Sequence, residues 1–292
     1  MGKKLKPDSA SPAAFELVLG AGGVKGYAHI GVLQAIEKYN VAIGNTTGVS
    51  IGSLIAAFFK NGYSAAEIER IFQAEDFMGE GAKTLHRWRQ ALSPRAVQRA
   101  GLTNLAPIFQ KAIRKYKLVP QDDLTIIAFN VSTLSPVRFS GRDYNLANAL
   151  AASCAVPFVM QPVCNLVKEK SQSQAQWLID GFMYHTHPSS FCSGPAIISK
   201  LGFASALPSE LLPAGQMLLH LGEMLNAPLL NWLFDDPKGG EHILIQSGMP
   251  DVAALSFGTS AAKCKQMIGY ARQQALIALR QAKSSGKLPL AS

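Results

Sequence analysis

The stretch that decides the fold reads VAIGNTTGVSIGSLIAAFFK and spans residues 41–60. Its centre, Gly48-Val49-Ser50-Ile51-Gly52, has the G-x-S-x-G pattern of a nucleophile elbow, in which a serine occupies a sharp turn between a strand and a helix. The small residues on either side let strand and helix pass closely while the serine adopts a strained backbone. The apolar run from Ser53 to Lys60 predicts the helix. Because this pentapeptide also occurs in structural turns, the rest of the chain has to decide between the two interpretations.

A strand–loop–helix unit precedes this stretch. A strand is predicted at Phe15–Leu19 and a helix at Tyr27–Tyr39, joined by the loop Gly20-Ala21-Gly22-Gly23-Val24-Lys25-Gly26. Such a loop presents backbone N–H groups to an anion. It matches neither nucleotide-binding pattern, because a P-loop has Gly before Lys, and a dinucleotide fingerprint has its third glycine where Lys25 stands. Since successive βα units bring their loops to the same sheet edge, we expect this loop to donate hydrogen bonds to the oxyanion of an ester attacked by Ser50.

Further elements follow along the chain. A hairpin is predicted from the strands Leu124–Val131 and Val137–Ser140, and a later strand at Trp177–Ile179 ends at Asp180-Gly181. The other predicted elements are helices at 145–152, 216–234 (broken at Pro228) and 260–282, and a strand at 196–203. No internal repeat or linker interrupts them, so we predict a flexible basic arm at 1–13 and one domain at 14–292.

The composition limits the function classes. Of 292 residues, 48% are hydrophobic and 16% charged, so the chain can bury a large core and is not a disordered protein. No run is long and apolar enough for a transmembrane helix, and the N-terminus lacks the apolar segment of a signal peptide. The four cysteines form no C-x-x-C pair, and no His or carboxylate group shows ligand spacing. We therefore expect reduced thiols, no metal, and a protein that is cytoplasmic or peripherally membrane-bound.

The formal net charge of +9 suggests an anionic partner, either nucleic acid or a phospholipid surface, although such a charge also serves solubility alone. Basic side chains gather around Trp88, which would suit an anionic lipid surface, and the alternative is an ordinary solvated helix face. These side chains are Lys83, His86, Arg87, Arg89, Arg95 and Arg99.

Four ordered blocks of the sequence resemble the patatin-like phospholipases, a family of lipid acyl hydrolases. The blocks are Gly22-Gly23-Val24-Lys25-Gly26, Gly48-Val49-Ser50-Ile51-Gly52, Ala152-Ser153-Cys154-Ala155-Val156-Pro157 and Asp180-Gly181. The resemblance implies a three-layer α/β/α sandwich with a central, mostly parallel sheet. It also implies hydrolysis of lipid or phospholipid esters without calcium or a cofactor, and with no nucleic acid partner.

The resemblance also assigns roles to individual residues. Ser50 would be the nucleophile and Asp180 its base, so that the two form a catalytic dyad. The loop residues Gly22, Gly23, Lys25 and Gly26 would line the oxyanion site, chiefly through backbone N–H groups, and Gly48, Gly52 and Gly181 complete the motifs. One position departs from the family, which usually has Gly or Ala where Phe182 stands, and a bulky side chain there could narrow the site.

Three alternatives remain open at this point. A Ser-His-Asp esterase would use His220 or His242, with His185 and His187 as further candidates. An acyltransferase would pass the acyl group to an alcohol instead of water. A catalytically silent lipid- or partner-binding module would keep the fold and the apolar segment 217–234, with Trp232 and Phe234 near its end.

Overall fold

The computed structural model describes residues 14–75, 77, 103–157, 159–169, 172–183, 188–209, 217, 220–221, 223–225, 242–256 and 259–288. The predicted basic arm, the cluster around Trp88, His185, His187, Trp232 and Phe234 lie outside the described residues. The predicted helix at 216–234 lies largely outside them as well.

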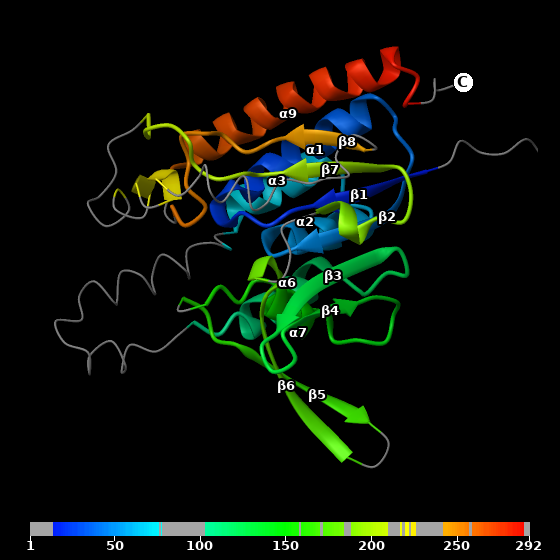
Figure 1. Cartoon of the computed structure of the whole chain (residues 1–292), viewed down its shortest axis with the longest axis vertical. Coiled ribbons are helices and arrows are strands. Elements are labelled where there is room, and N and C mark those ends of the chain that lie inside the picture. Colours follow the sequence, from blue (N-terminus) through cyan, green and yellow to red (C-terminus); the bar gives the residue numbers. More distant parts are fainter. Residues whose placement is uncertain are drawn as a thin grey trace, which may run out of the picture.

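A mixed eight-stranded sheet forms the centre of the molecule (Figure 1). Its parallel strands are, in spatial order, β3 (Leu124–Asn130), β2 (Ile43–Val49), β1 (Phe15–Leu19), β7 (Ala196–Lys200) and β8 (Ile243–Gln246). The antiparallel strands are β4 (Ser135–Phe139), β5 (Val163–Glu169) and β6 (Gln172–Asp180). The β5–β6 hairpin extends from the body at the end of the sheet opposite β8 (Figure 1).

Strands β2 and β6 share one edge of β3. Strand β2 pairs with β3 up to Val49 opposite Ile127, and β6 pairs with it from Asp180 opposite Ala128 onward. The other edge of β3 is taken by β4, which pairs with residues 126–130. Because β2 runs parallel to β3 and β6 antiparallel, the carboxyl ends of β2 and β6 meet head to head between Ile127 and Ala128.

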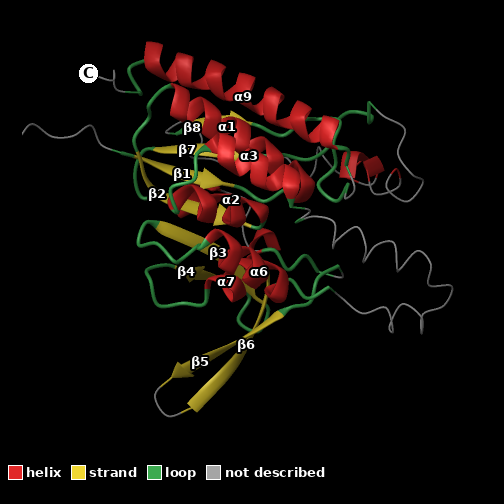
Figure 2. Cartoon of the chain, turned by 180° about the vertical axis from the view of Figure 1, so that it is seen from behind, coloured by secondary structure: helices red, strands yellow, loops and turns green. Residues whose placement is uncertain are grey.

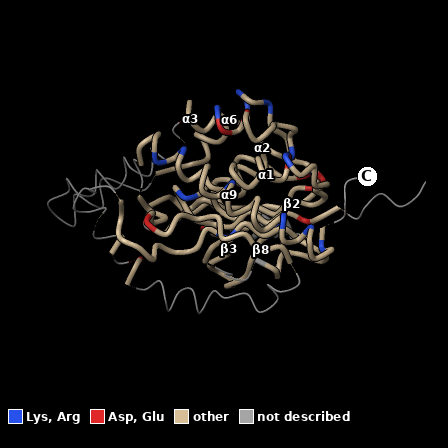
Figure 3. The backbone as a smooth tube through the Cα atoms, turned by 90° about the horizontal axis from the view of Figure 1, so that it is seen from above, with Lys and Arg blue, Asp and Glu red and all other residues tan. Residues whose placement is uncertain are grey.

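The α-helices that the structure describes lie on one face of the sheet (Figures 2 and 3). They are α1 (Tyr27–Lys38), α2 (Ile51–Lys60), α3 (Ala65–Ala74), α6 (Ala106–Tyr116), α7 (Leu146–Ser153) and α9 (Ala261–Ser284). The described short 3₁₀ helices are η1 (Gly23–Gly26), η2 (Gly181–Met183) and η3 (Pro188–Phe191). A capping box begins α3, where the Ser64 hydroxyl accepts from the Glu67 N–H and the Glu67 carboxylate accepts from the Ser64 N–H.

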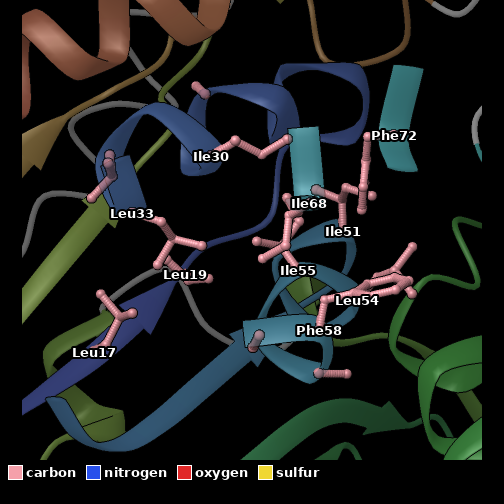
Figure 4. Packing of buried hydrophobic residues seen from close by; sticks show 14 of the residues in the cluster. Leu17, Leu19, Ile30, Leu33, Ile51, Leu54, Ile55, Phe58, Ile68 and Phe72 are labelled. Atoms are coloured by element: carbon pink, nitrogen blue, oxygen red, sulfur yellow. The ribbon is translucent and has the colours of Figure 1, made fainter. Parts of the chain in front are cut away.

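The main core lies between these helices and the sheet. Alternate residues of β1 face opposite sides of the sheet. Leu17 and Leu19 point toward the helices, while Val18 joins a smaller cluster on the other face with Phe191 of η3. Figure 4 shows part of the main core, with Leu17, Leu19, Ile30, Leu33, Ile51, Leu54, Ile55, Phe58, Ile68 and Phe72 labelled. Helix α2, which follows the serine elbow, is buried along most of its length, so this core holds Ser50 in place.

The predicted fold class is confirmed: the chain forms an α/β structure with a central sheet and flanking helices. The two predicted βα units are adjacent and parallel, as expected. The second layer of helices expected on the other face is not among the described residues.

Candidate active site

Ser50 stands at a strained turn between β2 and α2. Its backbone has φ 55° and ψ −130°, in a region that L-residues rarely occupy. Both glycines of the motif are needed at this turn for steric reasons. A Cβ on Gly48 would lie 2.3 Å from Ser53 Cα, and a Cβ on Gly52 would lie 2.2 Å from the Leu19 carbonyl oxygen. The G-x-S-x-G spacing therefore reflects close packing of α2 against β2 and β1.

Hydroxyl groups hold both backbone polar groups of Ser50. The Ser50 N–H donates to Ser153 Oγ at 2.9 Å, and Ser153 Oγ donates in turn to the Ile127 carbonyl at 2.6 Å. The Ser50 carbonyl accepts from Ser53 Oγ at 2.6 Å and from the Ser53 N–H at 2.8 Å. The strained backbone of Ser50 is thus fixed on both sides by buried partners.

The side chains of Ser50 and Asp180 meet at the junction of β2 and β6. Ser50 Oγ donates to Asp180 Oδ2 at 2.5 Å, which is in the range of a charge-assisted O–H···O bond. Asp180 Oδ1 accepts from the Phe182 N–H at 2.9 Å. Gly181 allows this approach, because a Cβ there would lie 2.4 Å from the Ile127 carbonyl oxygen.

Burial raises the proton affinity of the Asp180 carboxylate. Only 4% of each of Ser50 and Asp180 is exposed. Desolvation raises the pKa of Asp180 to about 6, and the hydrogen bonds from Ser50 and Phe182 act in the opposite direction. Burial likewise raises the pKa of the neighbouring Cys154 thiol, so this cysteine is a neutral, unreactive side chain beside Ser50 and Asp180.

The glycine loop after β1 lies against the start of α2. A Cβ on Gly26 would lie 2.4 Å from the Ile51 side chain, and a Cβ on Gly23, whose φ is +53°, would lie 2.1 Å from the Ala254 carbonyl oxygen. The Lys25 N–H donates to the Gly22 carbonyl at 3.0 Å. Among the described residues, no hydrogen-bond acceptor is assigned to the N–H groups of Gly22 and Gly23.

The side chain of Lys25 is fully buried and points away from solvent. Its Nζ donates to the Gly202 carbonyl at 3.1 Å. Desolvation lowers its pKa to about 8, against the opposing effect of Glu223 and Asp251. Glu223 also accepts from the Ala204 and Ala254 N–H groups, at 2.6 and 2.9 Å. The Lys25 side chain therefore links the glycine loop to Gly202. The Lys25 backbone N–H already donates to the Gly22 carbonyl.

A neutral histidine supports the same loop. His29 Nε2 lies 2.8 Å from the Gly20 carbonyl, which can only accept, so Nε2 carries the proton. His29 Nδ1 then accepts from Ser199 Oγ at 2.7 Å. Complete burial lowers the pKa of His29 to about 4, so the imidazole stays neutral and acts as a structural link between β1, α1 and β7.

The described histidines proposed for a Ser-His-Asp triad, His220 and His242, make no hydrogen bond to this pair. His220 Nε2 donates to the Ala206 carbonyl at 2.9 Å. Within the described residues, no imidazole is hydrogen-bonded to Ser50 or Asp180.

Phe182 lies directly beside the Asp180 carboxylate and contacts another aromatic ring. Its ring packs edge-on against Phe203, with centroids 6.0 Å apart. Phe203 follows Gly202, the residue that Lys25 holds. The large residue at this position therefore connects the end of β6 to the loop after β7.

No role is predicted from the sequence for Ser53, Ser153 or His29. Ser153 belongs to the block at 152–157, so its place in that block was the available signal. No group of three potential metal ligands occurs among the residues that the structure describes. The four cysteines are free, with Cys154 and Cys264 buried and Cys164 exposed.

A family model described as "Patatin-like phospholipase" matches residues 17–189, more than half of the chain. The Bacillus subtilis protein described as "Uncharacterized protein YqhO" is 25% identical over 194 residues, which cover 59% of this chain and 64% of that protein. The mouse "Patatin-like phospholipase domain-containing protein 6" is 30% identical over 155 residues, which cover 51% of this chain and 11% of that protein. The chain thus covers less than two thirds of the length of these relatives.

A solved structure shares the fold. VipD from Legionella pneumophila superimposes with a TM-score of 0.51 and 14% sequence identity, covering 93% of this chain and 68% of that one. At this identity the similarity concerns the fold alone.

Proposed function

Because the chain belongs to the patatin-like phospholipase family, we propose that it is a serine lipid acyl hydrolase of the phospholipase A or esterase type. It cleaves fatty acyl esters with Ser50 as the nucleophile and Asp180 as its base. The observation that carries this proposal is the 2.5 Å hydrogen bond from Ser50 Oγ to the buried Asp180 carboxylate. The family itself, predicted from the four sequence blocks, is confirmed.

The proposed reaction has two steps that mirror each other. In the first, Ser50 Oγ attacks the acyl carbonyl while its proton moves to Asp180, and the proton then passes to the departing lipid alcohol as its C–O bond breaks. In the second, Asp180 takes a proton from water, the hydroxide attacks the acyl-enzyme, and the fatty acid leaves as Ser50 regains its proton. A carboxylate with a pKa near 6 is largely ionised at neutral pH and is a stronger base than an ordinary one.

The oxyanion of each tetrahedral intermediate would be bound by the glycine loop. Gly22 and Gly23 are the proposed donors, because the N–H of Lys25 is already committed within the loop. The Ser50 N–H is likewise committed, to Ser153. Asp180 accepts and returns the proton, and backbone N–H groups stabilise the negative charge on the oxyanion, so the proposed reaction needs no calcium ion.

We further propose a lipid or phospholipid substrate, presented at an anionic membrane surface that the protein contacts peripherally. The net charge of +9 suits an anionic partner. Because the family is a phospholipase family, we favour an anionic lipid surface over nucleic acid as that partner. In the part that the structure describes, no helix has the length and apolar character required to cross a bilayer. The free cysteines suit a reducing compartment, and we propose the cytoplasm.

The direct test is hydrolysis of a p-nitrophenyl ester and of phospholipid vesicles, both without calcium. Ser50→Ala and Asp180→Asn should each lower kcat by about 10³-fold or more, since both remove a group that takes part in bond formation or proton transfer. His220→Ala should retain activity. Labelling by a fluorophosphonate probe reports activated serine directly and should be lost in Ser50→Ala.

The alternatives give different results in this experiment. Loss of activity in folded His220→Ala would indicate a triad. Acyl transfer to an added alcohol at a rate above hydrolysis would indicate a transferase. An unlabelled wild-type protein without hydrolysis would indicate a silent binding module.

A further inference from the structure

We propose that Ser153 is a positioning residue, which fixes the backbone of Ser50 relative to Asp180 through one hydroxyl group. This inference rests on the proposed hydrolase function. It concerns a residue at the end of α7, more than a hundred positions from the nucleophile in sequence.

The hydrogen-bond directions at Ser153 are fixed by chemistry. The side chain is fully buried, and its Oγ has a single proton, which goes to the Ile127 carbonyl because that group can only accept. The oxygen lone pairs then accept the Ser50 N–H. Both contacts have hydrogen-bonding distances, 2.6 and 2.9 Å, so the hydroxyl forms a bridge between Ser50 and β3.

This bridge takes the place of strand pairing at the point where pairing stops. The parallel register of β2 with β3 ends at Val49 opposite Ile127, and Ser50 turns away with φ 55°. A buried backbone N–H without a partner is strongly unfavourable, and a strained residue keeps its conformation only when its surroundings hold it. Ser153 meets both requirements.

The same carbonyl of Ile127 also locates the other half of the dyad. Gly181 packs directly against the Ile127 carbonyl oxygen, where a Cβ would come within 2.4 Å. Asp180 is paired with the next residue, Ala128. Ser153 therefore links Ser50 to the Ile127 carbonyl, the same group against which Gly181 packs next to Asp180. The 2.5 Å distance between Ser50 Oγ and Asp180 Oδ2 depends on this common contact.

A matched comparison of two serines tests this role. Ser53 and Ser153 are both fully buried and both bind the Ser50 backbone, but the Ser50 carbonyl keeps a second partner, the Ser53 N–H, when the Ser53 hydroxyl is removed. Ser153→Ala should lower kcat and the rate of fluorophosphonate labelling by about 10- to 100-fold with little change in KM, since small misplacements of reacting groups have effects of this size. Ser53→Ala should lower both by less than about tenfold.

A conservative variant covers the case in which Ser153→Ala does not fold. Ser153→Cys replaces the hydroxyl by a somewhat larger thiol that hydrogen-bonds more weakly, so its kcat should lie between those of wild type and Ser153→Ala. The melting temperature of each variant separates loss of folded protein from loss of rate in the folded protein.

Two results would overturn the proposal: a folded Ser153→Ala or Ser153→Cys with wild-type kcat and labelling rate, or an equal loss in Ser53→Ala and Ser153→Ala. These differ from failure of the proposed function, which would appear in the wild type as absence of both hydrolysis and label. That last result would remove the basis of the inference as well.

Discussion

The carboxylate of Asp180 is subject to two opposed influences. Desolvation disfavours its charged form and raises its pKa to about 6, while Ser50 and Phe182 donate hydrogen bonds that favour the charge. The balance suits a general base, because the group is ionised at neutral pH and yet binds a proton more readily than an exposed aspartate does.

The pH dependence of activity should report this balance. We expect kcat/KM for the p-nitrophenyl ester to rise with pH through about 6 and then to level, because only the ionised Asp180 accepts the Ser50 proton. A rise centred near pH 4 would contradict desolvation as the dominant influence. A rise that persists unchanged in Asp180→Asn would assign the titration to another group.

The same raised pKa predicts that the folded state loses stability as pH rises, whereas activity increases as pH rises. In the unfolded chain Asp180 titrates near its ordinary value of 3.8, so the folded state binds the proton more tightly between about pH 4 and 6 and is destabilised as pH rises through that window. Above pH 6 the full penalty remains, about 3 kcal/mol for the difference between 3.8 and about 6.

Asp180→Asn should therefore be more stable than wild type at pH 7, by roughly 1–3 kcal/mol after allowing for the hydrogen bond that the amide makes less well. Chemical denaturation at pH 7 and at pH 3.5 is the measurement. Most of the gain should disappear at pH 3.5, where Asp180 is protonated in the folded wild type and largely protonated in the unfolded chain. A variant that is destabilised equally at both pH values would show that the charge of Asp180 has no cost in the folded state.

At the scale of elements, the β2–α2 elbow depends on close contact between backbones. Gly52→Ala would place a methyl group 2.2 Å from the Leu19 carbonyl oxygen, and backbone atoms on both sides would have to move. We expect a loss of about 2–4 kcal/mol in the free energy of unfolding, as for overpacked buried sites.

Gly269 offers a matched control for this substitution. It lies inside α9, is exposed, and has no atom within 4 Å of the position of a new Cβ. Gly269→Ala should stabilise the protein by about 0.5–1 kcal/mol, the difference in helix propensity between the two residues. Thermal unfolding of both variants is the test, and a neutral Gly52→Ala would mean that α2 can shift without cost.

Two strands were absent from the sequence analysis, and both have a physical explanation. Strand β8 is only four residues long, and β5 follows the proline-containing segment 155–162 and carries charged residues. Short or polar strands give weak periodic signals, and their pairing with β7 and β6 depends on distant partners.

In the molecule as a whole, exposed apolar side chains lie near the junction of β2 and β6 where Ser50 and Asp180 meet. Trp177 of β6 lies beside the end of β3, where the Val131 N–H donates to its carbonyl. Leu134 lies in the turn between β3 and β4. Trp177 is 49% exposed and Leu134 73% exposed, and Trp177 lies three residues before Asp180. Aromatic residues of this kind favour the membrane–water interface, so the side of the molecule near β6 is the side that we expect to contact a lipid surface.

This expectation can be measured with vesicles that contain anionic lipid. Trp177→Ala and Leu134→Ala should weaken binding in a sedimentation assay, and binding should fall as ionic strength rises because of the net charge of +9. Ile277→Ala is the control, because Ile277 is also exposed but lies on α9, at the opposite end of the molecule from β6 (Figure 1). Equal effects of all three variants would argue against a defined contact surface.

The local parts of this protein can be predicted from its amino-acid sequence. The serine elbow, the glycine loop, the strands next to them and the α3 capping box follow from steric requirements and hydrogen bonds that act within a few residues. The family also follows from the order of the four blocks.

How those parts meet depends on the tertiary structure. Ser50 and Asp180 are 130 positions apart, and they come together because β6 continues the edge of β3 that β2 leaves at Val49. The raised pKa of Asp180, the inward direction of Lys25 and the bridge through Ser153 arise from burial between distant segments. No local pattern encodes such burial, because it is a property of the register and packing of the whole sheet.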